Sequence, residues 1–153
     1  MILQDRLTSH INIWLYVDMT KFARLMALLS DTGRLRILML LTRKELCVCQ
    51  IMGVLGISQP LVSRNLNLME AAGFIKSRKE GKLVFYSLRD DLDPVNERML
   101  EILQDLLTSD SMVTEDLKSL RDCEEFQKKT GRCDMKTFSD FMERRRKGRG
   151  RTH

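Results

Sequence analysis

The sequence predicts a mainly α-helical fold with one small β-hairpin (α+β class). Apolar residues recur every three or four positions from Met19 to Leu41 and again after Pro94, which is the period of an amphipathic α-helix. Between residues 74 and 88 that period is lost, and two runs rich in β-branched and aromatic residues flank a Glu-Gly dipeptide, a pattern typical of a hairpin. A chain of 153 residues is expected to form one domain with an extension or tail.

Three helical segments are expected before residue 57. The first starts at Met19 and is marked by apolar residues at helical spacing, namely Phe22, Leu25, Met26 and Leu29. After a break at residues 30–33, a second apolar helix covers residues 35–41, with Asp31 or Thr32 available as its N-cap. A third segment begins within residues 45–51 and continues briefly to Gly56.

The next helix, expected from Ser58 to Ala72, has clear boundary signals. Ser58 is a suitable N-cap, Pro60 lies in the first turn, and Gly73 follows the last turn. One face is apolar and is formed by Val62, Leu66 and Met69. The opposite face carries hydrogen-bonding side chains, namely Gln59, Ser63, Arg64 and Asn67. A short helix, a tight break and a second helix of this kind predict a helix-turn-helix.

The expected hairpin at residues 74–88 is basic. It carries Lys76, Arg78, Lys79 and Lys82 against Glu80 alone. A hairpin appended to a helix-turn-helix is a wing, so the predicted fold is a winged helix-turn-helix. A further amphipathic helix follows Pro94, and residues 112–153 are sparse in apolar residues and rich in charge. We therefore divide the chain into an N-terminal extension (1–18), a winged domain (19–108) and a charged C-terminal extension (109–153).

The net charge of +5 is concentrated near the C-terminus, in Arg144, Arg145, Arg146, Lys147, Arg149 and Arg151. Removing these six positive charges leaves −1, so any nucleic-acid role of the folded body needs a local argument. The arginine-rich tail has two interpretations: it adds nonspecific phosphate contacts, or it is a disordered, solvated tail, which its composition favours.

No targeting or membrane segment is predicted. The opening residues lack a basic region followed by a long apolar stretch and a small-residue cleavage site. No apolar stretch reaches the roughly 18 residues of a membrane helix. We expect a cytoplasmic protein without membrane contact, in which four cysteines are thiols, metal ligands or redox sensors rather than structural disulfides. Met19 is a possible internal start.

The helix at residues 58–72 is the candidate DNA reader. Its four polar side chains are expected to reach base edges or phosphates in a major groove. The basic residues of the wing would hold the flanking backbone. The alternative is a solvated polar helix face beside an ordinary charged hairpin.

Three stretches, LSDTGRLRILMLL (29–41), ELCVCQI (45–51) and LGISQPLVSRNLNLMEAAGFIKSRKEGKLVFYSL (55–88), carry a family resemblance. In this order they resemble the ArsR/SmtB family of metal-sensing winged-helix repressors, over roughly residues 20 to 107. The resemblance implies a homodimer, paired through its first and last helices, on a near-palindromic operator in double-stranded DNA. A dimer with two recognition helices would also raise the DNA affinity of a small domain that by itself contacts few phosphates.

The motif ELCVC resembles the arsenite-sensing branch of that family. The resemblance implies that Cys47 and Cys49 bind arsenite, As(III), or antimonite as inducer. Thiolates are soft ligands, and the positive end of a helix dipole favours the thiolate form. Residues two apart point away from each other in a regular helix, so chelation by both is expected to distort the first turn. The alternative is that both are small buried residues.

The third ligand is not defined by the motif. Family members with this motif often have a third cysteine where this chain has Met52, whose thioether is a much weaker ligand. Either two thiolates suffice, or Cys123 or Cys133 contributes. A zinc site is disfavoured, because the histidine- and carboxylate-rich zinc site of other family members has no counterpart in DDLDPVNERMLEIL (90–103).

The sequence leaves two alternatives to an arsenite-responsive repressor, a repressor with a different switch and a thiol enzyme. The same fold would serve a repressor switched by thiol oxidation or by another soft metal ion. A thiol enzyme is disfavoured, because the chain has no Cys-x-x-Cys motif beside a βαβ pattern, no phosphate-binding glycine loop and no plausible histidine base.

Overall fold

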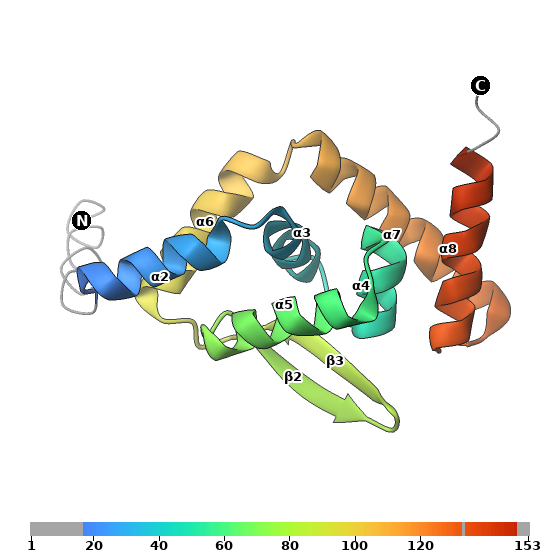
Figure 1. Ribbon diagram of the computed structural model, residues 1–153, viewed down its shortest axis with the longest axis horizontal. Coiled ribbons are helices and arrows are strands. Elements are labelled where there is room, and N and C mark those ends of the chain that lie inside the picture. Colours follow the sequence, from blue (N-terminus) through green and yellow to red (C-terminus); the bar gives the residue numbers. More distant parts are fainter. Residues whose placement is uncertain (1–16, 133, 150–153) are drawn as a thin grey trace, which may run out of the picture.

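The computed structural model describes residues 17–132 and 134–149 (Figure 1). The elements in chain order are α2 (Met19–Leu29), α3 (Thr32–Leu41), β1 (Leu46–Cys47), α4 (Val48–Leu55), α5 (Gln59–Ala71), β2 (Ile75–Glu80), β3 (Leu83–Leu88), α6 (Pro94–Leu107), α7 (Ser111–Thr130) and α8 (Met135–Arg149). The fold is mainly helical with a small antiparallel sheet, which confirms the predicted fold class. None of the helices in the described ranges is both long and apolar enough to cross a membrane.

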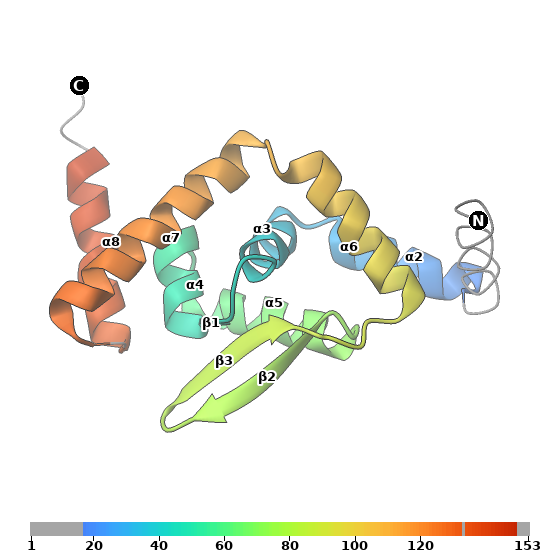
Figure 2. The same cartoon turned by 180° about the vertical axis from the view of Figure 1, so that it is seen from behind.

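Helix α3 lies at the centre of the molecule. It contacts α2, α5, α6, α7 and β3, and α6 and α7 form an arch over it (Figures 1 and 2). Its last five residues, Ile37 to Leu41, are all buried. Asp31 caps its first turn by accepting a hydrogen bond from the Arg34 backbone N–H at 2.9 Å. This central helix is the platform on which the helix-turn-helix packs.

Helices α4 and α5 form the predicted helix-turn-helix. Helix α4 ends at Gly56, whose φ of 68° is left-handed and therefore suits glycine. Ser58 is the N-cap of α5, and Pro60 lies in its first turn, as the sequence predicts. The turn between the helices therefore spans only Gly56 to Ser58.

The wing is part of a three-stranded antiparallel sheet with the order β1-β3-β2. Strands β2 and β3 form the predicted hairpin, and Gly81 adopts a left-handed φ of 60° at its tip. The short strand β1 was not predicted. It pairs Leu46 with Tyr86 and Cys47 with Phe85, so the segment just before α4 is attached to the wing.

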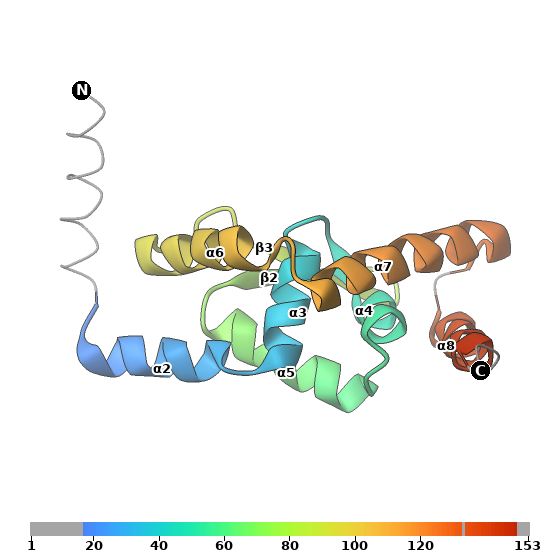
Figure 3. The same cartoon turned by 90° about the horizontal axis from the view of Figure 1, so that it is seen from above.

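The C-terminal part of the described chain packs against the winged domain. Helix α7 contacts α3 and α4, and α8 contacts α4 and α7; Figure 3 shows α8 at the opposite end of the molecule from α2. The hydrophobic core includes Leu120, Cys123, Phe138 and Phe141 from these helices. The arginine-rich run is helical up to Arg149, so the interpretation of a disordered tail is wrong for residues 144–149. Arg151 and residues 1–16 lie outside the described residues.

Candidate DNA-binding surface and thiol pair

Helix α5 presents its polar face to solvent and its apolar face to the core. Val62, Leu66 and Met69 are fully buried. Of the four predicted DNA-reading residues, Ser63 is half-buried, and the others are exposed, namely Gln59, Arg64 and Asn67. The four lie on one side of a helix whose other side is anchored, which is the arrangement that a reader of a DNA groove requires.

Asn65 is a polar residue of α5 whose role the sequence did not reveal. It is buried, and its side-chain nitrogen lies within 3.3 Å of where a β-carbon on Gly33 would be placed. The absence of a side chain at Gly33 lets α5 pack closely against the first turn of α3. A polar residue on a helix has no sequence signal that distinguishes this buried position from the exposed ones beside it.

The wing is less positively charged at its surface than its composition suggests. Lys76 forms an ion pair with Asp90. Lys79 and Lys82 are exposed, and neither has an ion-pair partner among the residues of 17–132 and 134–149. These two lysines are therefore the wing cations best placed to contact a phosphate.

Arg78 is engaged by two carboxylates. Its Nε donates to both carboxylate oxygens of Glu45 at 3.0 Å, and its Nη1 donates to Glu80 at 2.5 Å. Its guanidinium also lies 4.9 Å from the centre of the Phe85 ring. The hydrogen bonds from Arg78 hold the pKa of Glu45 below its ordinary value, and the pKa of Arg78 is raised in turn. Arg78 would have to exchange these partners to contact DNA.

The two cysteines of the motif lie at the start of α4. Cys47 is the N-cap, with an extended backbone (φ −86°, ψ 164°), and Cys49 lies within the first turn. Both are buried, with 1% and 5% of their surface exposed. Because Cys47 is extended rather than helical, the two residues do not have the fixed opposite directions of a regular helix. The pair therefore lies at the junction between strand β1 and helix α4.

A chain of hydrogen bonds connects this junction to α7. The Cys47 backbone N–H donates to Gln50 Oε1 at 3.0 Å, and Gln50 Nε2 donates to Gln127 Oε1 at 3.1 Å. Gln50 is itself buried. Neither glutamine was singled out from the sequence, because residues 77 positions apart give no local signal of contact.

Cys123 on α7 lies close to helix α4. It is completely buried, and its sulfur lies 3.7 Å from where a β-carbon on Gly53 would be placed. Gly53 is one helical turn beyond Cys49. Within residues 17–132 and 134–149, no group of three or more His, Cys, Asp or Glu side chains is placed to hold a metal ion. Cys133 lies outside the described residues, and Met52 is half-buried.

A helix-turn-helix with an exposed polar second helix, followed directly by a hairpin with exposed lysines, defines the winged helix-turn-helix class. Residues 31–77 match the sequence model of the family described as "Bacterial regulatory protein, arsR family". An uncharacterized HTH-type transcriptional regulator of Methanocaldococcus jannaschii, MJ1325, is 42% identical over 72 residues, which are 46% of this chain and 81% of that protein. The chain belongs to the ArsR family.

Further relatives are similar over the same region. The arsenical resistance operon repressor of Escherichia coli is 44% identical over 66 residues, 42% of this chain and 56% of that protein. The match spans between 54% and 58% of several other curated relatives, which are named as SmtB, cadmium-resistance and arsenic-resistance regulators. These relatives are transcriptional regulators by name rather than enzymes.

Solved structures show the same fold. Reduced HlyU from Vibrio cholerae is 31% identical with a TM-score of 0.50, and the match covers 57% of this chain and 90% of HlyU. The homodimeric winged helix-turn-helix domain of Mb0332 from Mycobacterium bovis, a possible ArsR-family regulator, is 25% identical with a TM-score of 0.50. That match covers 61% of this chain and 83% of the Mb0332 fragment.

Proposed function

We propose that this protein is a DNA-binding transcriptional repressor that releases its operator when arsenite or antimonite binds the thiolates of Cys47 and Cys49. The observation that carries the proposal is the position of the pair. Cys47 caps α4, which leads through a three-residue turn into α5. A ligand that changes the start of α4 therefore acts on the helix that presents the DNA-reading side chains. The arsenic-resistance relatives make a trivalent metalloid the first inducer to test.

The DNA-binding part of the proposal assigns two roles. The polar residues of α5, namely Gln59, Ser63, Arg64 and Asn67, would contact the major groove, and Lys76, Arg78, Lys79 and Lys82 of the wing would contact phosphates. Such a repressor would act in the cytoplasm on double-stranded DNA.

A homodimer would place two copies of α5 on a near-palindromic operator. Large apolar side chains of α2 and α6 are exposed, namely Met19, Phe22, Ile102 and Leu106. Both helices lie at the end of the molecule away from α8 (Figures 1 and 3). Burying these side chains against a second copy would remove apolar surface from water, in agreement with the expected pairing through the first and last helices of the winged domain. The homodimeric Mb0332 domain supports the formation of a dimer.

The donor chemistry at the thiol pair suits a soft trivalent ion, since two cysteine sulfurs, which bind such an ion as thiolates, lie two residues apart at a helix start. The two buried sulfurs would have to turn toward a common ligand, and this requires a change in the backbone at Cys47. That change would disturb two contacts shown by the structure: the hydrogen bond from the Cys47 N–H to Gln50 and the pairing of Cys47 with Phe85 in the wing. A single event would thereby affect both the reading helix and the wing.

The proposal is tested with DNA of defined sequence. A duplex is selected by the reduced full-length protein from a random-sequence library, and its binding is measured by fluorescence anisotropy with and without sodium arsenite. We expect arsenite to weaken binding of the parent but not of Cys47→Ser or Cys49→Ser. Selection of no duplex would contradict the repressor function.

Two further cysteine variants and an oxidant separate the alternatives. Cys123→Ser and Cys133→Ser test whether a third thiolate is needed, and a response like that of the parent in both would support a two-thiolate site. If hydrogen peroxide releases the duplex while arsenite and cadmium do not, the repressor is a thiol oxidation switch. Release by cadmium alone would instead indicate another soft metal as inducer.

A further inference from the structure

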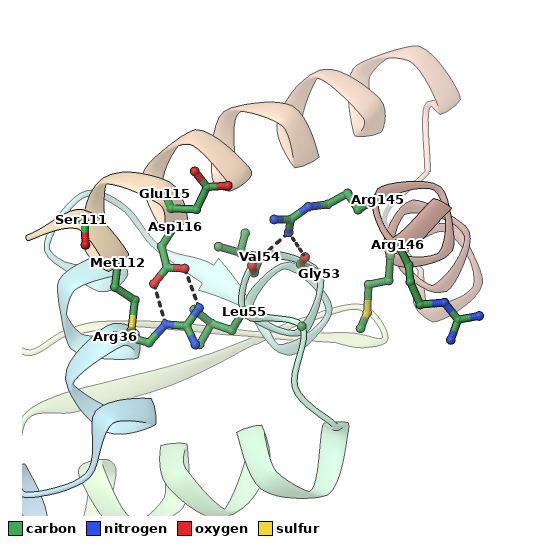
Figure 4. A pocket seen from close by; sticks show the side chains of 12 residues that line it. Arg36, Gly53, Val54, Leu55, Ser111, Met112, Glu115, Asp116, Arg145 and Arg146 are labelled. Atoms are coloured by element: carbon green, nitrogen blue, oxygen red, sulfur yellow. Dashed lines mark hydrogen bonds and ion pairs between the residues drawn. The ribbon is translucent and has the colours of Figure 1, made fainter. Parts of the chain in front are cut away.

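The C-terminal end of α4 is held by one arginine of the charged run. Arg145 Nη1 donates to the backbone carbonyls of Gly53 and Val54, both at 3.1 Å, and its Nη2 donates to Ser119 Oγ at 2.6 Å. Figure 4 shows the guanidinium reaching from α8 to the two carbonyls, across a pocket also lined by the Arg36–Asp116 pair. One side chain thus joins α8 to both α4 and α7.

These contacts satisfy groups that a helix cannot satisfy by itself. The last four carbonyls of a helix have no partner within it, and the negative end of the helix dipole favours a cation. In α4, the Gly56 N–H donates to the Met52 carbonyl at 2.8 Å. Arg145 donates to the next two carbonyls, those of Gly53 and Val54. Charge-assisted hydrogen bonds of this kind are among the stronger ones in proteins, so the end of α4 is attached firmly to α8.

The surrounding packing fixes this attachment. The Arg145 guanidinium lies 5.7 Å from the centre of the Phe141 ring. A β-carbon on Gly53 would lie 3.0 Å from Phe138 and 3.5 Å from Phe141, so α8 approaches α4 closely at this glycine. At the other end of α4, Gln50 donates to Gln127 of α7. The two C-terminal helices therefore hold α4 at both of its ends.

The other cations of the run differ from Arg145. Arg144 stacks over Phe126 at 5.2 Å, and Lys147 pairs with Glu143 at 2.7 Å within α8. Arg146 is exposed, and it points away from the two carbonyls in Figure 4. Arg146 is therefore a matched control, since it has the same charge and lies on the same helix without the contact to α4.

We infer that Arg145 is a positioning residue for DNA recognition: by holding the Gly53 and Val54 carbonyls, it fixes the turn at Gly56–Ser58 from which α5 begins. The inference rests on the proposed DNA binding. It assigns the α7–α8 pair the role of a brace that keeps α5 in its DNA-reading position. Loss of the brace would leave the DNA-contacting side chains intact but less well placed.

The first test compares Arg145→Ala, Arg145→Lys and Arg146→Ala with the parent on the selected duplex, over a series of salt concentrations. We expect Arg145→Ala to bind roughly tenfold more weakly, the change typical of losing charge-assisted hydrogen bonds, with an unchanged dependence on salt. Arg145→Lys should recover part of the loss, because a lysine ammonium reaches fewer of the three acceptors, and Arg146→Ala should bind like the parent. If Arg145→Ala also lowers the salt slope by about 0.9, Arg145 contacts a phosphate directly and the inference is overturned.

The second test needs no DNA. Amide hydrogen exchange at residues 53–58 should be faster in both Arg145 variants than in the parent and unchanged in Arg146→Ala. Equal exchange in all four proteins would overturn the inference even if DNA affinity falls. If the parent selects no duplex, the repressor function fails, while the exchange data still decide whether Arg145 holds α4. Should Arg145→Ala not fold, the milder Arg145→Lys gives both readouts.

Discussion

The ion pair between α3 and α7 provides a quantitative test of how firmly the C-terminal helices are attached. Arg36 Nε and Nη2 donate to the two carboxylate oxygens of Asp116 at 2.8 and 2.6 Å. The Asp116 side chain is only 5% exposed and that of Arg36 is 23% exposed. The hydrogen bonds that Arg36 donates to Asp116 raise the pKa of Arg36, so the guanidinium stays charged at all ordinary pH values. Replacing Arg36 by methionine would leave a buried carboxylate without its partner.

The expected cost follows from that burial. Breaking a buried pair by removing one partner costs about 3–5 kcal/mol, and partial exposure of Arg36 favours the lower end. We therefore expect Arg36→Met to lower the free energy of unfolding by about 3 kcal/mol. In a chain of this length, that loss corresponds to a Tm lower by roughly 6–12 °C.

The assay is urea unfolding followed by circular dichroism at one fixed protein concentration, because dimerisation would make stability depend on concentration. Arg36→Met, Asp116→Leu and the double variant form a cycle. The double variant should regain most of the stability, since no charge is left buried. Arg98→Met is the control, because its pair with Glu101 is exposed and should change stability by less than about 1 kcal/mol. A loss in Arg36→Met no larger than in this control would refute the reasoning.

Four further predictions concern other contacts and an exposed surface. Glu45→Gln combined with Glu80→Gln should release Arg78 from both of its carboxylate partners, so the selected duplex should bind more tightly and with a salt slope steeper by about 0.9, whereas Glu101→Gln should leave both unchanged. Arg78 holds the pKa of Glu45 below its ordinary value. The contribution of this pair to stability is therefore present at neutral pH and is lost as the pH falls through the folded-state pKa of Glu45. The difference in urea midpoint between the parent and Glu45→Gln should shrink between neutral pH and about pH 3. Phe138→Ala should cost about 3–5 kcal/mol in urea unfolding, because the ring is 1% exposed against α4; a loss below about 1 kcal/mol would show that α8 is not part of the core. Leu106→Glu should shift a dimer toward monomer in sedimentation experiments with little effect on monomer folding, since Leu106 is 73% exposed; an unchanged dimer would place the interface elsewhere.

Much of the winged domain was predictable because its signals are local. The apolar period, the N-cap at Ser58, Pro60 in the first turn and the glycine after the last turn of α5, Gly73, which has a left-handed φ of 81°, each act within a few residues. The hairpin was predictable for the same reason, since a two-residue turn brings adjacent strands together. The strand β1 was missed, because two residues are too few to show a period and their partner lies some 40 positions later.

The candidate site was only partly predictable. The sequence identified the residue types at positions 47 and 49 and on the polar face of α5, and the structure places them on the two helices of the helix-turn-helix. The sequence could not indicate that Arg78 is held by Glu45 and Glu80, because a composition gives the number of charges and not their partners. Cys123 was a candidate from its chemistry alone, and only the packing of α7 shows that it lies against α4.

The sequence by itself therefore determined the order and type of the helices and of the two hairpin strands of the winged domain, the polar face of α5 and the thiol motif, because periodicity, capping and turn chemistry depend on neighbouring residues. The tertiary structure alone decided the role of the C-terminal part. By composition, the run from Arg144 to Lys147 resembles a solvated tail, yet Arg145 bonds the carbonyls of Gly53 and Val54, more than 90 positions away. A hydrogen bond of that kind is made with backbone atoms, which every residue has, so no pattern of side chains in the sequence marks its acceptor.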